Sequence, residues 1–173
     1  DRPPPMCHLP PCSAGYDCYK RRLNPKAWDD HAIRLGDATG KEVRTLAGHS
    51  GPVIHVSFNA IGDRLVSASE DGTARVWDVD TGATVFVLAG HTKHVMSAQF
   101  SSDDSRIVTA SWDQSVRIWS AASGRELVAF RDHHGWADWA IFSPDGNRLL
   151  TTYPDGSVLL RDRVPAADRL ARS

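Results

Sequence analysis

A serine, a histidine and an aspartate occur in this sequence at spacings that allow them to meet in a fold. Ser67 and Asp71 lie in the stretch LVSASEDGTARVWD (65–78), and His49 lies shortly before it. A hydroxyl, an imidazole and a carboxylate are the groups of a hydrolase triad, in which the base activates the hydroxyl for attack on a carbonyl. The same groups can also form an internal hydrogen-bond network in a scaffold. The elements that carry them decide between these two roles.

These residues belong to a unit that occurs three times at a shift of 42 residues. LAGHSGPV (46–53) returns as LAGHTKHV (88–95) and more weakly as FRDHHGWA (130–137), and the stretch 65–78 returns at 107–120 and 149–162. A fixed period of this length is typical of repeat folds. An acyl-transfer site would not be copied three times with Ser giving way to Thr, and no G-x-S-x-G element occurs. The repetition therefore favours the network over the triad.

Each unit contains four short runs rich in Val, Ile, Thr, Phe and Trp. In the first unit they are VIHVSF, RLVSAS, TARVWDV and TVFVLA, and Gly, Asp, Asn and Pro fill the breaks between them. Residues of the first kind favour strands, and those of the second kind favour turns. The pattern predicts an all-β fold with one four-stranded antiparallel sheet per repeat.

The unit resembles a WD40 repeat, the blade of a β-propeller. The resemblance is carried by the Gly48–His49 pair, the turn residue Asp71 and the Trp77–Asp78 pair, at a period of about 40–45 residues. It implies a structural tetrad of hydrogen-bonded side chains in each blade. The tetrad residues are His49, Ser67, Asp71 and Trp77 in the first repeat, His91, Thr109, Asp113 and Trp119 in the second, and His133, Thr151 and Asp155, with Arg161 in place of Trp, in the third.

The register divides the chain into about three and a half repeats of an incomplete or open propeller. Residues 1–24 are a Pro-rich segment outside the repeats, and 25–47 are a half blade of two strands with Leu35 at the Trp position. Complete WD40 repeats follow at 48–89 and 90–131, and a degenerate repeat with a C-terminal tail at 132–173. Three explanations stay open: the chain is an excerpt of a longer propeller, two copies close one ring, or the array is an open arc.

The resemblance also implies a partner-binding face at the loops beside the tetrads. Residues at the frequent contact positions, several of them aromatic or otherwise apolar, are Ile54, Glu70, His94, Met96, Trp112, Trp136 and Asp138. Aromatic and Met side chains supply much of the affinity at protein interfaces. The alternative for the two tryptophans is that they pack beneath a neighbouring loop. Trp139 and His55 are expected to be structural.

Composition excludes several kinds of partner. The 173 residues include 20 basic and 21 acidic side chains, so no charge excess draws the chain to nucleic acid or to a membrane surface. No apolar run is long enough to span a bilayer, and no signal peptide occurs, so we expect a cytoplasmic protein. Cys7, Cys12 and Cys18 with His8 lack the paired spacing of a zinc site. No metal and no cofactor are expected.

Two functional classes follow. The first is a non-catalytic scaffold or sensor that binds a protein or peptide, as part of a larger multidomain regulatory or signalling protein, with self-association as a way to complete the propeller. The alternative is a small-molecule-binding or enzymatic propeller with a site at the channel mouth, in which His94 or Asp138 takes part.

Overall fold

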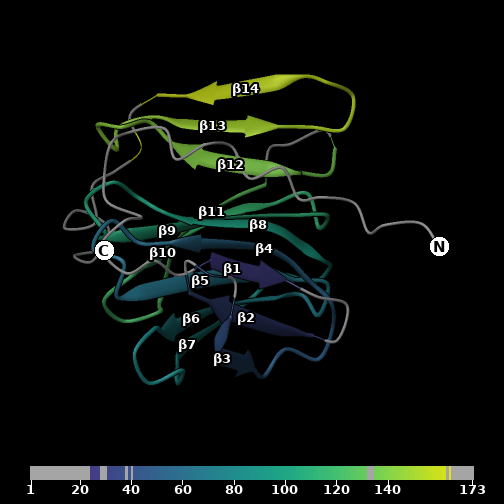
Figure 1. The fold of residues 1–173 in the computed structure, drawn as a ribbon. Coiled ribbons are helices and arrows are strands. Elements are labelled where there is room, and N and C mark those ends of the chain that lie inside the picture. The colour runs from purple at the N-terminus through teal and green to yellow at the C-terminus, as the bar shows by residue number, and fades with distance from the viewer. Residues whose placement is uncertain are drawn as a thin grey trace.

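The computed structural model describes residues 24–27, 31–37, 39, 41–131, 135–162 and 164, which form strands and loops without a helix (Figure 1). The strands make four antiparallel sheets in chain order. The two central sheets have four strands each, β4 (Val53–Phe58), β5 (Arg64–Ser69), β6 (Thr73–Asp78) and β7 (Thr84–Ala89), then β8 (Val95–Phe100), β9 (Arg106–Ser111), β10 (Val116–Ser120) and β11 (Glu126–Phe130). The first sheet contains β1 (Asn24–Ala27), β2 (Ala32–Gly36) and β3 (Glu42–Ala47), and the fourth contains β12 (Trp139–Phe142), β13 (Leu149–Thr152) and β14 (Val158–Arg161). The predicted all-β fold of four-stranded blades is confirmed.

Consecutive sheets pack against each other, and Figure 1 shows β3 at the bottom and β14 at the top. Three apolar clusters hold the sheets together, and each joins two consecutive sheets. Leu35 of the first sheet packs with Trp77 of the second, Val76 of the second with Ile107 of the third, and Ile118 of the third with Leu149 of the fourth. These side chains are almost completely buried. Burial between sheets is therefore the main stabilising contribution of the fold.

The tight turns need left-handed backbone, and three described residues other than glycine adopt it: His31, Asp104 and Gln114. Gly72 has φ +83° in the turn after β5, but Gln114 takes the same place after β9 with φ +68°. Gly62 has φ +80° in the turn after β4, and Asp104 takes that place after β8 with φ +55°. Its carboxylate accepts hydrogen bonds from the backbone of Ala60 (2.8 Å) and Ile61 (3.3 Å) in the neighbouring sheet. Asp104 thus offsets an unfavourable φ, whereas no such bond is found for Gln114 within the described residues.

The first sheet corrects the predicted two-strand half blade. It has a third strand, β1. This strand begins at Asn24, the last residue of the segment expected to lack strands, and includes Pro25. β1 pairs with β2 alone, so it is an edge strand. A proline is tolerated on an edge because one side of that strand needs no ladder hydrogen bond.

The prediction that Leu35 lies at the Trp position is also wrong, by one residue. Gly36 pairs with Glu42 as Trp77 pairs with Thr84, so Gly36 occupies the Trp position. A slip of one residue reverses the two faces of a strand, and this register turns Leu35 toward Trp77 of the second sheet. Burial of the Leu35 side chain therefore favours this register of β2, which differs by one residue from the 42-residue shift.

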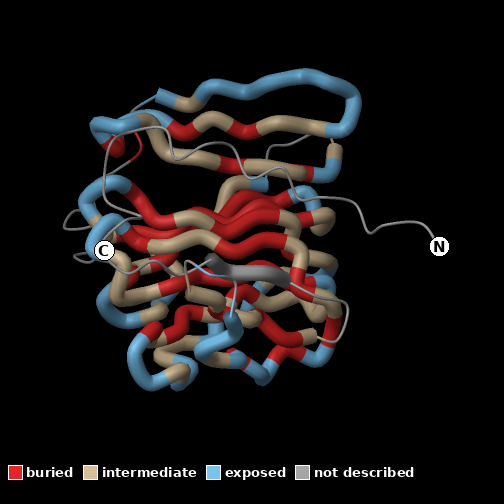
Figure 2. Tube along the Cα trace, in the orientation of Figure 1, coloured by how far each residue is buried: buried red, intermediate tan, exposed pale blue. Residues whose placement is uncertain are grey.

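The fourth sheet leaves apolar surface in contact with solvent, as the pale blue of β14 shows (Figure 2). Val158 and Leu160 are 59% and 51% exposed, while Val116 and Ile118, their counterparts in the third sheet, are fully buried. The described residues form no closed ring of sheets. Where the structure describes the chain, it has no helix long and apolar enough to cross a membrane.

Candidate functional site

The second sheet brings His49, Ser67, Asp71 and Trp77 into one hydrogen-bonded chain. The Trp77 indole N–H donates to Ser67 Oγ (2.8 Å), which lies 2.7 Å from His49 Nε2, and His49 Nδ1 lies 2.7 Å from an Asp71 carboxylate oxygen. Burial lowers the pKa of His49 against the opposing influence of Asp71, so the imidazole is neutral near pH 7. A proton on Nδ1 then satisfies all four side chains at once.

The third sheet repeats this arrangement. Trp119 donates to Thr109 Oγ1 (2.9 Å), His91 Nε2 lies 2.8 Å from the same oxygen, and His91 Nδ1 lies 3.0 Å from Asp113. Burial alone would raise the pKa of Asp113, but hydrogen bonds from His91 and Ser115 outweigh it and hold that pKa well below its usual range. The carboxylate is therefore ionised throughout the neutral range.

The fourth sheet has a different arrangement at the same positions. Thr151 is buried, and Asp155 accepts hydrogen bonds from the Ser157 backbone (2.8 Å) and hydroxyl (2.6 Å). Arg161 replaces the indole, and its guanidinium carbon lies 4.3 Å from the centre of the Phe130 ring in β11. His133 lies outside the described residues. The side chain of the third strand thus faces the outer strand of the preceding sheet instead of closing a buried network.

The triad chemistry considered for these residues requires an accessible hydroxyl. Ser67 and Thr109 are both fully buried, and each hydroxyl oxygen already accepts an indole N–H. A nucleophile must reach a carbonyl carbon in a cleft. The geometry of these two networks supports blade architecture and offers no place for a substrate.

Three aromatic rings form a stack at the loop ends of the third and fourth sheets. His94 lies 5.1 Å from Trp112 with ring planes 18° apart, and Trp112 lies 5.2 Å from Trp136 with planes 27° apart. The Trp112 indole N–H points to Asp138 (3.3 Å). We call His94, Trp112 and Trp136 the aromatic stack. Trp136, at its end, is 48% exposed.

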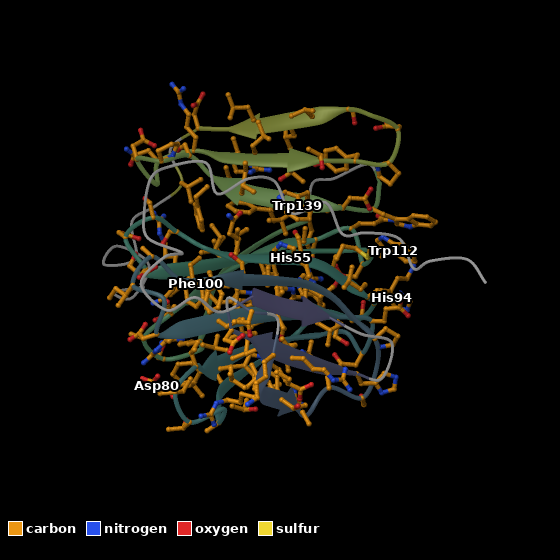
Figure 3. All side chains as sticks on the ribbon, in the orientation of Figure 1. His55, Asp80, His94, Phe100, Trp112 and Trp139 are labelled. Atoms are coloured by element: carbon orange, nitrogen blue, oxygen red, sulfur yellow. The ribbon has the colours of Figure 1, made fainter. Side chains whose placement is uncertain are left out.

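Backbone hydrogen bonds fix the stack. The Trp112 N–H donates to the His94 carbonyl (3.0 Å), joining the loop before β8 to the turn after β9. The Ala137 N–H donates to the Ser111 carbonyl (3.1 Å), which ties the Trp136 loop to the same turn. Figure 3 shows His94 and Trp112 at one end of the sheets and Asp80 at the other. Backbone hydrogen bonds at the ends of the sheets therefore hold the aromatic stack in place.

Four of the seven predicted partner-binding residues meet in this cluster, since Asp138 joins the three rings. The others lie apart from the ring contacts: Glu70 is exposed, and Ile54 and Met96 are half-buried in β4 and β8. Beside Trp136 the surface forms a cavity of about 910 Å³ that Gln114 and Tyr153 also line. Neither residue stood out in the sequence, because their approach to Trp136 depends on how two sheets pack.

His55 and Trp139 link the first strands of three sheets. Buried His55 accepts the Ala98 N–H through Nδ1 (3.4 Å), and its ring meets the Trp139 ring edge-on at 4.5 Å. Burial lowers the pKa of His55 to about 4. Ser97, its counterpart in β8, accepts the Ala140 N–H (3.2 Å). The two positions therefore make the same bond to the next sheet.

No group of three or more His, Cys, Asp or Glu side chains suited to a metal ion occurs in the described part of the chain. Cys7, His8, Cys12 and Cys18 lie outside that part.

Comparison with known proteins identifies the repeats. A family model described as WD domain, G-beta repeat matches residues 40–78 and 82–120. The chain is 54% identical over 41 residues to periodic tryptophan protein 2 homolog of Schizosaccharomyces pombe, a stretch that is 24% of this chain and 5% of the relative. It is 38% identical over 61 residues to transcription initiation factor TFIID subunit 5 of Drosophila melanogaster (35% and 9%). It is 48% identical over 56 residues to U3 small nucleolar RNA-associated protein 21 homolog of Schizosaccharomyces pombe (32% and 6%).

These matches span less than a tenth of the length of each relative named. They therefore show similarity to the repeat and not to the whole relative. The family match agrees with the tetrads of the second and third sheets, whose residues 49–77 and 91–119 lie within the two matched segments. Residues 40–78 and 82–120 are therefore WD40 repeats, and the four-stranded sheets to which they contribute have the form of β-propeller blades.

Proposed function

We propose that this chain is a non-catalytic scaffold that binds a protein or peptide on the face bearing the aromatic stack, as part of a larger multidomain regulatory protein. The observation that carries the proposal is the stack itself, with a half-exposed tryptophan at its end. Binding of other proteins is the general role of WD40 repeats, and their fold places loops from several sheets on one face.

The stack has the physical properties of an interface anchor. Trp136 is braced by Trp112, which is braced in turn by His94 and held by Asp138. A preorganised ring loses little conformational entropy when a partner covers it, and burial of an exposed indole contributes favourably. Tryptophans of this kind are frequent among the few residues that dominate binding energy. A partner therefore gains most by covering Trp136.

The two residues named for a chemical alternative are both engaged with Trp112. His94 stacks on its ring, and Asp138 accepts its N–H. These contacts favour a positioning role for both residues within the stack. An activity at the channel mouth would need them turned toward a substrate, so we do not propose one.

The scaffold function is tested by immobilising the chain and its Trp136→Ala variant and comparing the amount of partner protein that each captures. Binding should be lost or fall at least tenfold, since hot-spot truncations cost about 2 kcal/mol or more. Ile61→Ala is the matched control, because Ile61 is 72% exposed at the opposite ends of the strands, between β4 and β5. Equal binding by the two variants contradicts the proposal. A chemical activity that His94→Ala abolishes would instead support the alternative.

We also propose that a second copy of the chain covers the outer face of the fourth sheet. Val158 and Leu160 are exposed there, although their counterparts in the second and third sheets are buried beneath the next sheet. An apolar sheet face of this kind favours packing against another sheet. Light scattering should give the mass of a dimer for the chain and of a monomer for Leu160→Lys. Val43→Lys, at a valine 51% exposed on β3, should leave the dimer intact.

The cytoplasmic location and the signalling role stay predictions. The names of two relatives above refer to transcription initiation and to small nucleolar RNA association, and neither name refers to signalling. Each relative is matched over a small share of its length. A place of this chain in a regulatory assembly is thus part of the proposal.

A further inference from the structure

The end of the aromatic stack opens on the cavity of about 910 Å³. Trp136 lines this cavity together with Tyr153 and Asp155, whereas Trp112 and His94 do not line it. The cavity therefore lies on the side of Trp136 that faces away from the stack. One face of the indole is covered by Trp112, and the other is available to a ligand.

The free face of an indole favours a particular kind of group. Its π-electrons attract cations, and a planar group continues a stack with the least loss of contact. A guanidinium is both planar and permanently charged, while an ammonium is a compact and strongly hydrated charge. Trp136 at the end of a stack is thus better matched to arginine than to lysine.

The charges around the cavity agree with a cationic ligand. Asp162 forms an ion pair with Arg148 (2.8 Å), and Arg161 lies over the Phe130 ring. Asp155 is exposed, and hydrogen bonds from Ser157 lower the pKa of its carboxyl group, so it is ionised at neutral pH. No ion pair of Asp155 occurs within the described residues. Among the described residues that line this cavity, Asp155 is therefore the carboxylate that a cationic ligand can neutralise.

Apolar walls complete the recognition site. Leu159 of β14, on the opposite face of the strand from Val158 and Leu160, lines the same cavity and is exposed. The methylene stem of an arginine and its neighbouring peptide residues gain by covering such surface. A small inorganic cation would gain nothing from it. The combination of ring, carboxylate and apolar wall is that of a site for a peptide side chain.

We propose that the partner of this chain presents an arginine, whose guanidinium stacks on the free face of Trp136 and is neutralised by Asp155. This inference rests on the proposed scaffold function and adds the chemistry of the residue that it recognises.

The test uses the full chain and four pools of random nonapeptides whose central residue is fixed as Arg, Lys, Gln or Phe. The Arg pool should bind about tenfold more tightly than the Gln pool, and more tightly than the Lys pool. Trp136→Leu keeps apolar bulk but removes the ring, and it should abolish the preference for Arg. Asp155→Asn should reduce that preference severalfold and weaken its dependence on salt. Asp80→Asn makes the same charge change at the opposite end of the sheets and should have no effect (Figure 3).

The outcomes separate this inference from the scaffold proposal. If the Phe or Gln pool binds as tightly as the Arg pool, recognition of arginine is overturned while peptide binding stands. If Lys and Arg bind equally, stacking of a planar cation is overturned. If the Arg preference survives Trp136→Leu, the site lies elsewhere. If no pool binds, both the inference and the peptide-binding function fail.

Discussion

The third and fourth sheets come from the same repeat unit, but their third strands are held differently. In the third sheet, the buried Trp119 indole donates to Thr109, and Arg117 of the same strand pairs with Glu126 of β11. In the fourth sheet, the corresponding strand places Arg161 over Phe130. In the described part of the chain, no further strand pairs with β14 at the edge of this sheet.

The difference shows which interactions keep a blade rigid. A buried indole contributes both apolar burial and a satisfied hydrogen bond. Its removal leaves a buried hydroxyl without its donor, which lowers the free energy of unfolding. An exposed pair such as Arg148 and Asp162 contributes little, because solvent screens it. The fourth sheet therefore lacks the indole donor of this network, and its outer face is exposed.

The largest expected effect comes from removing the indole. Trp77→Ala should lower the free energy of unfolding by about 3–5 kcal/mol, because it opens a cavity between the first and second sheets and leaves Ser67 without its donor. Arg161→Ala, at the same position of the fourth sheet, should cost less than about 1 kcal/mol. Urea unfolding followed by tryptophan fluorescence and circular dichroism measures both. Equal losses would contradict the difference drawn between these sheets.

A pH-dependent effect of intermediate size is expected from His55. Its folded-state pKa is about 4, whereas an exposed imidazole titrates near 6.5, so the unfolded chain binds more protons between these values. Stability is complete above about pH 6.5 and should fall by about 3 kcal/mol as the pH drops to about 4.

His55→Ser tests this, since Ser97 fills the same position in the third sheet and makes the same bond. The variant should lose most of the slope in unfolding free energy between pH 6.5 and 4.5. His49, whose pKa is also lowered by burial, and carboxylates with lowered pKa such as Asp113 contribute to the slope that remains. An unchanged slope would show that His55 does not titrate with folding.

The smallest effect concerns Asp104 and Gln114, two of the residues other than glycine with left-handed backbone. Gln114→Gly should raise stability by about 0.5–1 kcal/mol, because glycine adopts φ +68° without strain. Asp104→Gly should instead lower it by about 1–2 kcal/mol, since the bonds to Ala60 and Ile61 are lost. Thermal unfolding of the two variants should shift in opposite directions, and a shift in the same direction would refute the compensation described for Asp104.

The repeated positions of the sheets could be predicted from sequence, because each strand carries its own pattern and the 42-residue shift superposes the patterns. Leu35 could not be placed by counting, since its burial against the second sheet displaces the register by one residue. β1 was missed because Pro25 argues against a strand unless the strand lies at an edge. The aromatic stack was foreseen only as separate positions. The meeting of Trp112 and Trp136 depends on the packing of two sheets, which no local pattern encodes.

The two family matches begin in the outer strand of one sheet and end in the third strand of the next, β3–β6 and β7–β10. One unit is therefore a covalent bridge between neighbouring blades. If 42 residues were excised from His49 to Gly90, β3 would be joined directly to the loop before β8, as it is now joined to the loop before β4. The array would become shorter by one sheet, with every remaining strand keeping an equivalent neighbour. Such a design allows the length of the array to change in whole units while each junction between sheets is preserved.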